Sequence, residues 1–144
     1  MLLMLTVAAI VLVADQASKA IVISRLAEGV VTTRTMFGMR LCHLTNRRPW
    51  WRSLRQLRLM SAALLLLVIA GSVIARALEV RSVDAALGAM FGGAAGNLVD
   101  GYLRRGITDF IDLRVWPVFN LADAAIVAGA ALCGWTAFSV LAGA

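Results

Sequence analysis

Long apolar stretches alternate with shorter polar segments along this chain of 144 residues. A helix that crosses a bilayer needs roughly 17–25 mostly apolar residues. Four stretches reach or approach that length; the first continues past Asp15 and Lys19, and charged residues enter the other three only near their ends. The pattern therefore predicts membrane-spanning helices near residues 3–24, 57–75, 83–101 and 122–142.

The polar segments that separate these stretches predict how the chain is folded across the membrane. Four spans place both chain ends on one side, with residues 25–56 and 102–121 on the other. Within residues 25–56, Val30–Thr35 and Met39–Thr45 are rich in Val, Thr and Leu on either side of Phe37-Gly38, which predicts two short strands. We expect one domain over residues 1–144: an all-α membrane protein whose four transmembrane helices carry a small β-cradle or flap between helices 1 and 2.

Composition excludes a water-soluble globular protein. Hydrophobic residues make up 61% of the chain and charged residues 15%, whereas a soluble domain has about 45–50% and about 25%. The net charge of +6 comes from cations that lie between apolar runs. Anionic headgroups of membrane phospholipid are therefore the expected partner, and no nucleic acid is expected.

Cysteine and histidine are too scarce for a zinc or copper site. The chain has two cysteines, Cys42 and Cys133, and one histidine, His43, while such a site uses three or four ligands of these types. One cysteine lies in a polar segment and the other in an apolar run, so a disulfide is not expected. We predict neither a metal nor another cofactor.

The carboxylates are the candidate chemistry. An ionisable side chain near membrane depth is costly, so each one needs a partner or a function. Of the eight acids, four fall at the same end of the predicted spans: Asp15, Asp100, Asp109 and Asp123.

Purely structural roles also explain parts of this pattern. Asp15 and Lys19 are four residues apart, which allows an ion pair within one helix. Asn120 and Asp123 have the spacing of a helix N-cap with an acid three residues on. The repeated glycines of the third span favour close helix packing. These interpretations remain open beside the catalytic one.

The catalytic interpretation is a pair of aspartates formed by Asp109 and Asp123. Two neighbouring carboxylates cannot both ionise easily, so they share a proton. The ionised carboxylate acts as a general base on water, and the protonated one donates to a peptide carbonyl. This chemistry needs no metal, cysteine or serine.

Four segments, in order along the chain, resemble motifs of the type II signal peptidases, the lipoprotein signal peptidases of bacterial membranes. Asp15-Gln16-Ala17-Ser18-Lys19 resembles the DQ-x-(S/T)-K element, and Gly96-Asn97-Leu98-Val99-Asp100 resembles G-N-x-x-D. The stretches that carry the two catalytic aspartates of the family are similar to Gly106-Ile107-Thr108-Asp109-Phe110-Ile111 and Trp116-Pro117-Val118-Phe119-Asn120-Leu121-Ala122-Asp123.

The resemblance implies an intramembrane aspartyl endopeptidase that removes the signal peptide from diacylglyceryl-modified prolipoproteins, just before the lipobox cysteine. Asp109 and Asp123 would be catalytic. The groups that bind or position the substrate would be Asp15, Lys19, Asn46, Asn97, Asp100 and Asn120. We expect a monomer in the bacterial inner membrane, with its active site at the extracytoplasmic face.

The chain departs from the family pattern at several positions. The element usually written N-x-G-A-A-F is Asn46-Arg47-Arg48-Pro49-Trp50-Trp51 here. Gly101 stands where an arginine usually follows the aspartate, and Arg104 or Arg105 are the candidates to replace that arginine. The residue after the second aspartate is Ala124 instead of Ser or Thr.

Two further conclusions follow from these departures and from the charges. A non-cleaving paralogue that binds or escorts a membrane partner is the alternative function, and a small structural subunit of a membrane complex is a third. The two long polar segments hold most of the arginines, so the positive-inside rule would place them in the cytoplasm. The resemblance places them outside, and we adopt that topology as the prediction.

Overall fold

The computed structural model describes residues 1–36, 39–47, 66, 70, 73 and 81–142. The described residues form three long helices and a small sheet. The helices are α1 (Leu2–Arg25), α3 (Arg81–Leu103) and α4 (Leu121–Ala142), and the strands are β1 (Val31–Met36), β2 (Met39–Asn46) and β3 (Ile107–Asp112). The helices cover three of the predicted spans. The second predicted span, 57–75, lies outside the described residues except for its helical positions Leu66, Ala70 and Val73.

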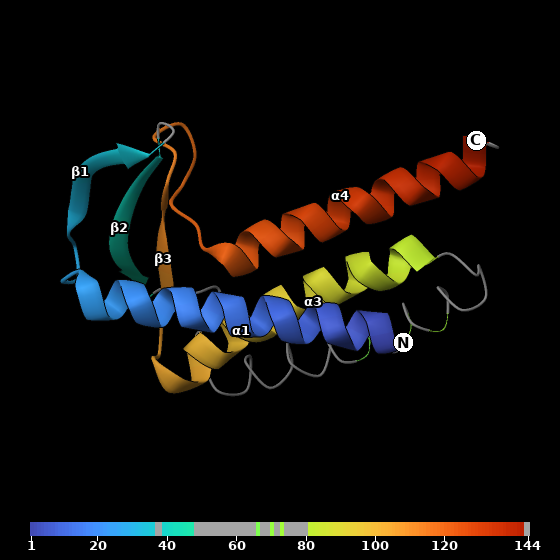
Figure 1. Ribbon diagram of the computed structural model, residues 1–144, viewed down its shortest axis with the longest axis horizontal. Helices are drawn as coiled ribbons and strands as arrows, with labels where there is room; N and C mark the ends of the chain where they lie inside the picture. Colours follow the sequence, from blue (N-terminus) through green and yellow to red (C-terminus); the bar gives the residue numbers. More distant parts are fainter. Residues whose placement is uncertain (37–38, 48–65, 67–69, 71–72, 74–80, 143–144) are drawn as a thin grey trace.

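The three helices run side by side along the length of the molecule, and the sheet stands at one end (Figure 1). Helix α3 contacts both α1 and α4 extensively, whereas α1 and α4 contact each other much less. Both chain ends lie at the end away from the sheet (Figure 1), which agrees with the prediction that they share one side.

Glycines let α3 approach its two neighbours to backbone contact. A Cβ atom on Gly92 would lie 2.4 Å from the carbonyl oxygen of Ala8 in α1, and one on Gly93 would lie 2.4 Å from that of Ala122 in α4. Such distances are far below van der Waals contact, so neither position can hold a side chain without moving a helix. The packing role that the glycine pattern predicts is confirmed.

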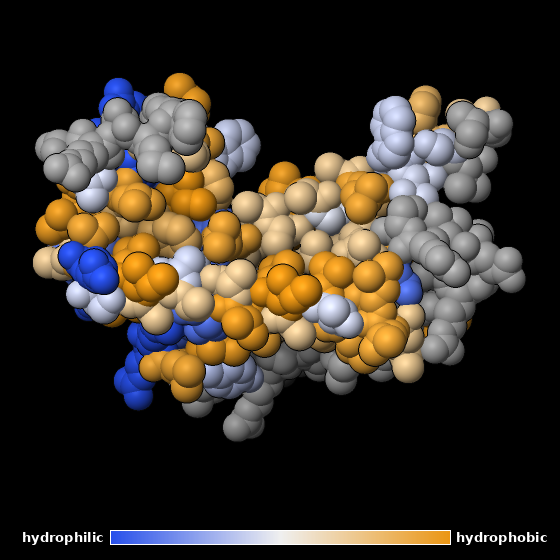
Figure 2. All heavy atoms as spheres, in the orientation of Figure 1, coloured by the Kyte–Doolittle hydropathy of each residue, from blue (hydrophilic) through white to orange (hydrophobic). Residues whose placement is uncertain are grey.

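Outside these contacts the helices present apolar side chains to their surroundings. Leu2, Ile10 and Val13 of α1 are exposed, as are Val127 and Phe138 of α4, and hydrophobic residues cover most of the visible helical face (Figure 2). By length and composition, α1 and the part of α4 at Leu121–Ser139 could cross a membrane. An apolar surface on two such helices is typical of a protein solvated by lipid.

The sheet has three antiparallel strands in the order β1-β2-β3. Strands β1 and β2 form the hairpin predicted around residues 37–38. These two strands lie where the β-element was predicted, but the sheet is larger than expected, because β3 comes from the segment between α3 and α4 and pairs with β2, with Leu44 opposite Asp109 and Asn46 opposite Ile107. This pairing brings the segment that follows α3 onto the hairpin that follows α1.

Interfacial tryptophans were also expected near the sheet. Trp116, in the segment that joins β3 to α4, is 67% exposed, as an interfacial anchor requires. Trp50 and Trp51 lie outside the described residues.

The glycine contacts give a testable prediction about stability. Gly92→Ala should lower the melting temperature of the detergent-solubilised protein, because its Cβ would strike the backbone of α1. Gly134→Ala is the matched control, since a Cβ at this exposed helical position meets nothing within 4 Å. It should keep or raise the melting temperature, because alanine favours a helix over glycine by about 1 kcal/mol. Equal effects of the two substitutions would contradict the packing role of Gly92.

Candidate active site

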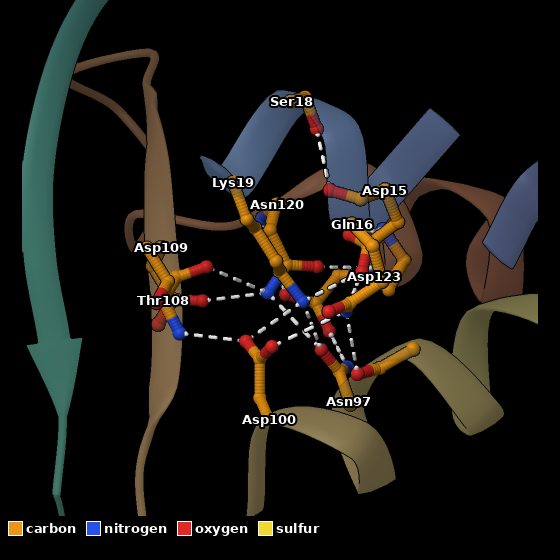
Figure 3. Close-up of polar contacts among 12 residues, drawn as sticks. Asp15, Gln16, Ser18, Lys19, Asn97, Asp100, Thr108, Asp109, Asn120 and Asp123 are labelled. Carbon is orange, nitrogen blue, oxygen red and sulfur yellow. Dashed lines mark hydrogen bonds and ion pairs between the residues drawn. The ribbon is translucent and has the colours of Figure 1, made fainter. Parts of the chain in front are cut away.

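A buried lysine joins α1 to α3 at the sheet end of the bundle. The ammonium of Lys19 lies 2.8 Å from Asp15 Oδ2 and 3.0 Å from Asp100 Oδ2, and all three side chains are fully buried. It also donates to Asn97 Oδ1 at 3.1 Å. Removing these charges from water costs several kcal/mol per ion unless close partners compensate. The predicted pair within α1 therefore exists, but it is also a link between helices (Figure 3).

Asp15 also holds the start of α4. Its Oδ1 accepts a hydrogen bond of 3.0 Å from the backbone N–H of Ala122, one of the first N–H groups of a helix, which lack partners within that helix. Its Oδ2 passes so close to α3 that a Cβ on Gly96 would lie 2.6 Å away. A single carboxylate thus contacts all three helices, and glycine at position 96 makes room for it.

Asp100 ties the segment after α3 to the same cluster. Its Oδ2 accepts the backbone N–H of Thr108 at 3.1 Å, and its Oδ1 accepts Gln16 Nε2 at 3.2 Å. The guanidinium of Arg104 bonds to Asp100 Oδ1 and donates to Gln16 Oε1 at 3.0 Å. Asp100 therefore has two cationic partners, Lys19 and Arg104, and it anchors the start of β3 against the helices.

Two carboxylates at the edge of this cluster are only half-buried. Asp109 of β3 accepts a hydrogen bond of 2.8 Å from Asn120 Nδ2, and Asp123 of α4 accepts one of 2.8 Å from Asn97 Nδ2. Figure 3 shows these side chains converging from β3, α3 and the start of α4. Each carboxylate is held by an amide donor, and each keeps partial access to the surroundings.

The helix cap that the sequence predicts is also present. The backbone N–H of Asp123 donates to Asn120 Oδ1 at 2.9 Å, and the backbone N–H of Asn120 donates to Asp123 Oδ2 at 3.3 Å. This reciprocal arrangement is a capping box. It uses Oδ2 of Asp123, while Oδ1 accepts the hydrogen bond from Asn97. The capping interpretation is therefore confirmed, and it does not exclude a chemical role for the same carboxylate.

The environment of Asp109 favours its protonated form. Burial, and after it the negative charge of Asp123, raise the pKa of this carboxyl from 3.8 to about 7, against the opposing effects of Asn120 and Lys19. A pair of interacting carboxylates titrates as a unit. These two can retain one proton between them near neutral pH, as acid–base catalysis by a carboxylate pair requires.

The sequence and the fold were compared with those of known proteins. The family model described as signal peptidase (SPase) II matches residues 7–139, which includes every element of the cluster. This chain belongs to the signal peptidase II family. The prediction of a peptidase of the signal peptidase II type, which acts in lipoprotein processing, is confirmed.

Individual relatives agree over most of the chain. A lipoprotein signal peptidase of Pelotomaculum thermopropionicum is 38% identical over 132 residues, which cover 88% of this chain and 86% of the relative. One of Azoarcus sp. is 32% identical over 151 residues, covering 94% and 82%. A solved bacterial membrane enzyme superposes with a TM-score of 0.77 at 22% identity, covering 94% of this chain and 87% of its own. That structural similarity concerns the fold alone.

The structure brings most of the predicted site residues of this signal peptidase II chain together. Seven of them belong to the connected polar cluster around Lys19, namely Asp15, Lys19, Asn97, Asp100, Asp109, Asn120 and Asp123. Asn46 differs, because it is an exposed residue at the last position of β2, opposite Ile107. Of the two candidates for the displaced arginine, Arg104 contacts Asp100.

Gln16 is a member of the cluster that the sequence analysis did not single out. Its amide donates to Asp15 Oδ2, to Asp100 Oδ1 and to the carbonyl oxygen of Gly96, and it accepts from Arg104. Its position beside Asp15 in the quoted motif was the available signal. The prediction was based on the cost of charged side chains at membrane depth, and this criterion does not select an uncharged glutamine.

The raised pKa of Asp109 predicts how stability depends on pH. Because the folded protein holds this proton more tightly than the unfolded chain, its stability should fall as pH rises from about 4 to about 7. Asp109→Asn removes the charge, so this variant should melt several degrees above the parent at pH 8 and close to it at pH 5. Thermal unfolding of the detergent-solubilised protein at the two pH values measures this difference.

Asp112 supplies a control of the opposite sign in the same strand. The backbone N–H of Arg114 and the guanidinium of Arg40, 2.5 Å away, hold the pKa of this carboxyl below its usual value. Asp112→Asn should therefore lower the melting temperature at both pH values. An Asp109→Asn variant that is no more stable than the parent at pH 8 would contradict the unfavourable charge assigned to Asp109.

Proposed function

We propose that this chain cleaves diacylglyceryl-modified prolipoproteins just before the lipobox cysteine, with Asp109 and Asp123 as its catalytic pair. The observation that carries the proposal is the state of these two carboxylates. Each is half-buried and held by an amide donor, and the pKa of Asp109 is raised to about 7. In a chain of the signal peptidase II family, this pair has the properties that hydrolysis of a peptide bond requires.

The mechanism uses one proton shared by the pair. The ionised carboxylate removes a proton from a water molecule, whose oxygen attacks the carbonyl carbon of the scissile peptide bond. The protonated carboxyl donates to the carbonyl oxygen as the tetrahedral intermediate forms. Collapse of that intermediate breaks the C–N bond, and a proton passes to the leaving amine.

The remaining predicted residues support the pair. We assign positioning roles to Asn97 and Asn120, because their amides donate to the two carboxylates. Asp15, Lys19 and Asp100 hold the elements that carry those amides, and Arg104 extends the same group through Asp100. Asn46, exposed at the end of β2, remains the candidate for direct contact with the substrate backbone.

We further propose one domain over residues 1–144, with four spans, in the bacterial inner membrane. Helices α1 and α3 run toward the sheet and α4 runs back from it, so that both chain ends lie away from the sheet (Figure 1); this arrangement supports an even number of spans. The active site would then lie at the extracytoplasmic face, where a substrate anchored by its own lipid can reach it. The protein would act as a monomer surrounded by phospholipid.

The catalytic assignment predicts the result of a cleavage assay. Asp109→Asn and Asp123→Asn should each reduce cleavage of a purified diacylglyceryl-modified prolipoprotein by at least about 100-fold, since each removes an acid–base group. Release of the signal peptide is followed by mass spectrometry. Asp112→Asn is the matched control, because Asp112 pairs with Arg40 outside the cluster, and it should retain activity.

The same assay separates the alternatives. Turnover by either cluster variant at the rate of the parent would refute the aspartyl mechanism. A parent protein that binds the lipidated substrate but never cleaves it would instead be the non-cleaving paralogue.

The topology gives a second prediction. Val115 is 90% exposed in the segment between β3 and α4, whereas native Cys42 is fully buried. In intact cells, Val115→Cys should therefore react with a membrane-impermeant maleimide, while the parent does not. Reaction of Val115→Cys only after the inner membrane is opened would place the catalytic end in the cytoplasm, as the arginine count suggests.

A further inference from the structure

A cavity of about 500 Å³ lies where the sheet meets the ends of α1 and α3. Its lining comes from four segments of the chain: Ile23, Glu28, His43, Thr45, Arg47, Arg104, Arg105 and Thr108. The strand register places it on the other face of the sheet from Asp109. Thr45 pairs with Thr108, and the next pair along the sheet is Leu44 with Asp109, so the side chains of the two pairs point to opposite faces.

The cavity wall is basic. Its lining contains three arginines, Arg47, Arg104 and Arg105, and a single carboxylate. That carboxylate belongs to Glu28 and lies 2.8 Å from the guanidinium of Arg47. Arg104 is partly engaged by Asp100 in the neighbouring cluster. No carboxylate among the described residues pairs with Arg105, which is exposed. The wall therefore has more positive charge than its own acidic groups neutralise.

The backbone at Arg105 has a conformation that is usual for glycine. It follows the last turn of α3 with φ = 56°, in the left-handed region where glycine is the usual residue after a helix. An ordinary side chain there costs on the order of 1 kcal/mol. Arg105 thus combines a backbone that suits glycine with a side chain that lines the cavity, whereas Arg114, which shares this backbone conformation, lies outside the lining.

The position of the cavity matches the boundary between hydrocarbon and headgroups. Ile23, near the end of α1, contributes to the lining and is 40% exposed. Ile21, about one helical turn before the end of α1, is 61% exposed. An exposed isoleucine of α1, a helix long enough to cross a membrane, thus lines the same cavity as arginines from other segments. Hydrophilic residues gather mainly at this end of the molecule (Figure 2).

We propose that this cavity binds the phosphate of an anionic phospholipid, with Arg47 and Arg105 as the principal ligands. Guanidinium groups bond phosphate oxygens in pairs, and the threonine hydroxyls of the lining are further donors. The acyl chains would lie along the exposed isoleucines of α1. The proposal goes beyond the proposed peptidase activity and does not depend on it, because the threonines of the cavity and Asp109 lie on opposite faces of the sheet.

Native mass spectrometry of the full chain, released from detergent micelles, tests the proposal. Phosphatidylglycerol and phosphatidylcholine are titrated in parallel. We expect one molecule of phosphatidylglycerol to bind per chain, with a higher affinity than phosphatidylcholine. Arg105→Gly removes the guanidinium but suits the backbone, so it should fold and weaken the binding of phosphatidylglycerol by about 5-fold. Arg105→Gln, which removes only the charge, should weaken it similarly.

Arg114→Gly is the matched control, because Arg114 is the other described arginine with positive φ, at 66°, and lies outside the cavity lining. It should bind the lipid like the parent, as should Asp109→Asn, which separates this test from that of cleavage. Equal losses in Arg105→Gly and Arg114→Gly, or no preference for phosphatidylglycerol, would overturn the proposal. Displacement of the lipid by an equal concentration of inorganic phosphate would overturn the assignment to lipid and indicate a soluble phosphate instead.

Discussion

The burial of one ammonium group is the constraint on which the rest of the site depends. Lys19 is removed from solvent, and its charge is tolerable only because Asp15 and Asp100 both lie within 3.0 Å. These two partners are themselves buried, and they hold the start of α4 and the start of β3 through backbone N–H groups. Without the ammonium group, two buried carboxylates would lie close to each other without this shared cation. Its attraction to both carboxylates therefore holds α1 and α3 together at this end of the bundle.

This constraint extends to the candidate catalytic pair, Asp109 and Asp123, through the orientation of two amides. Asn97 Oδ1 accepts from Lys19, so its Nδ2 must face Asp123. Asn120 Oδ1 accepts the backbone N–H of Asp123, so its Nδ2 is free to donate to Asp109. An amide that flipped in either residue would place oxygen against a carboxylate. The direction of the Asn97 hydrogen bond therefore follows from the position of the Lys19 charge, and that of the Asn120 hydrogen bond follows from the start of α4.

The sequence predicted well those features that depend on local pattern or on the cost of charge. Three helices lie where the apolar stretches predict them, the β1–β2 hairpin surrounds residues 37–38, and the aspartates converge at one end. Strand β3 was missed because its stability depends on a partner that is distant along the chain, β2, and six residues flanked by arginines give little local signal. The contacts of Gln16, and the cavity that Arg105 helps to line, likewise form only when segments distant along the chain meet.

The pairing of β2 with β3 has a consequence for how the site is made. The two strands are separated by the whole of α3 and by the segment before it, so the sheet closes only after that part of the chain has been synthesised and inserted. Contacts this far apart in sequence form late and slowly. Both candidate catalytic aspartates follow α3, and the cation that organises them precedes it. A partly synthesised chain therefore contains the buried cation without the two candidate catalytic carboxylates, which join it only when the later part of the chain folds onto α1 and β2.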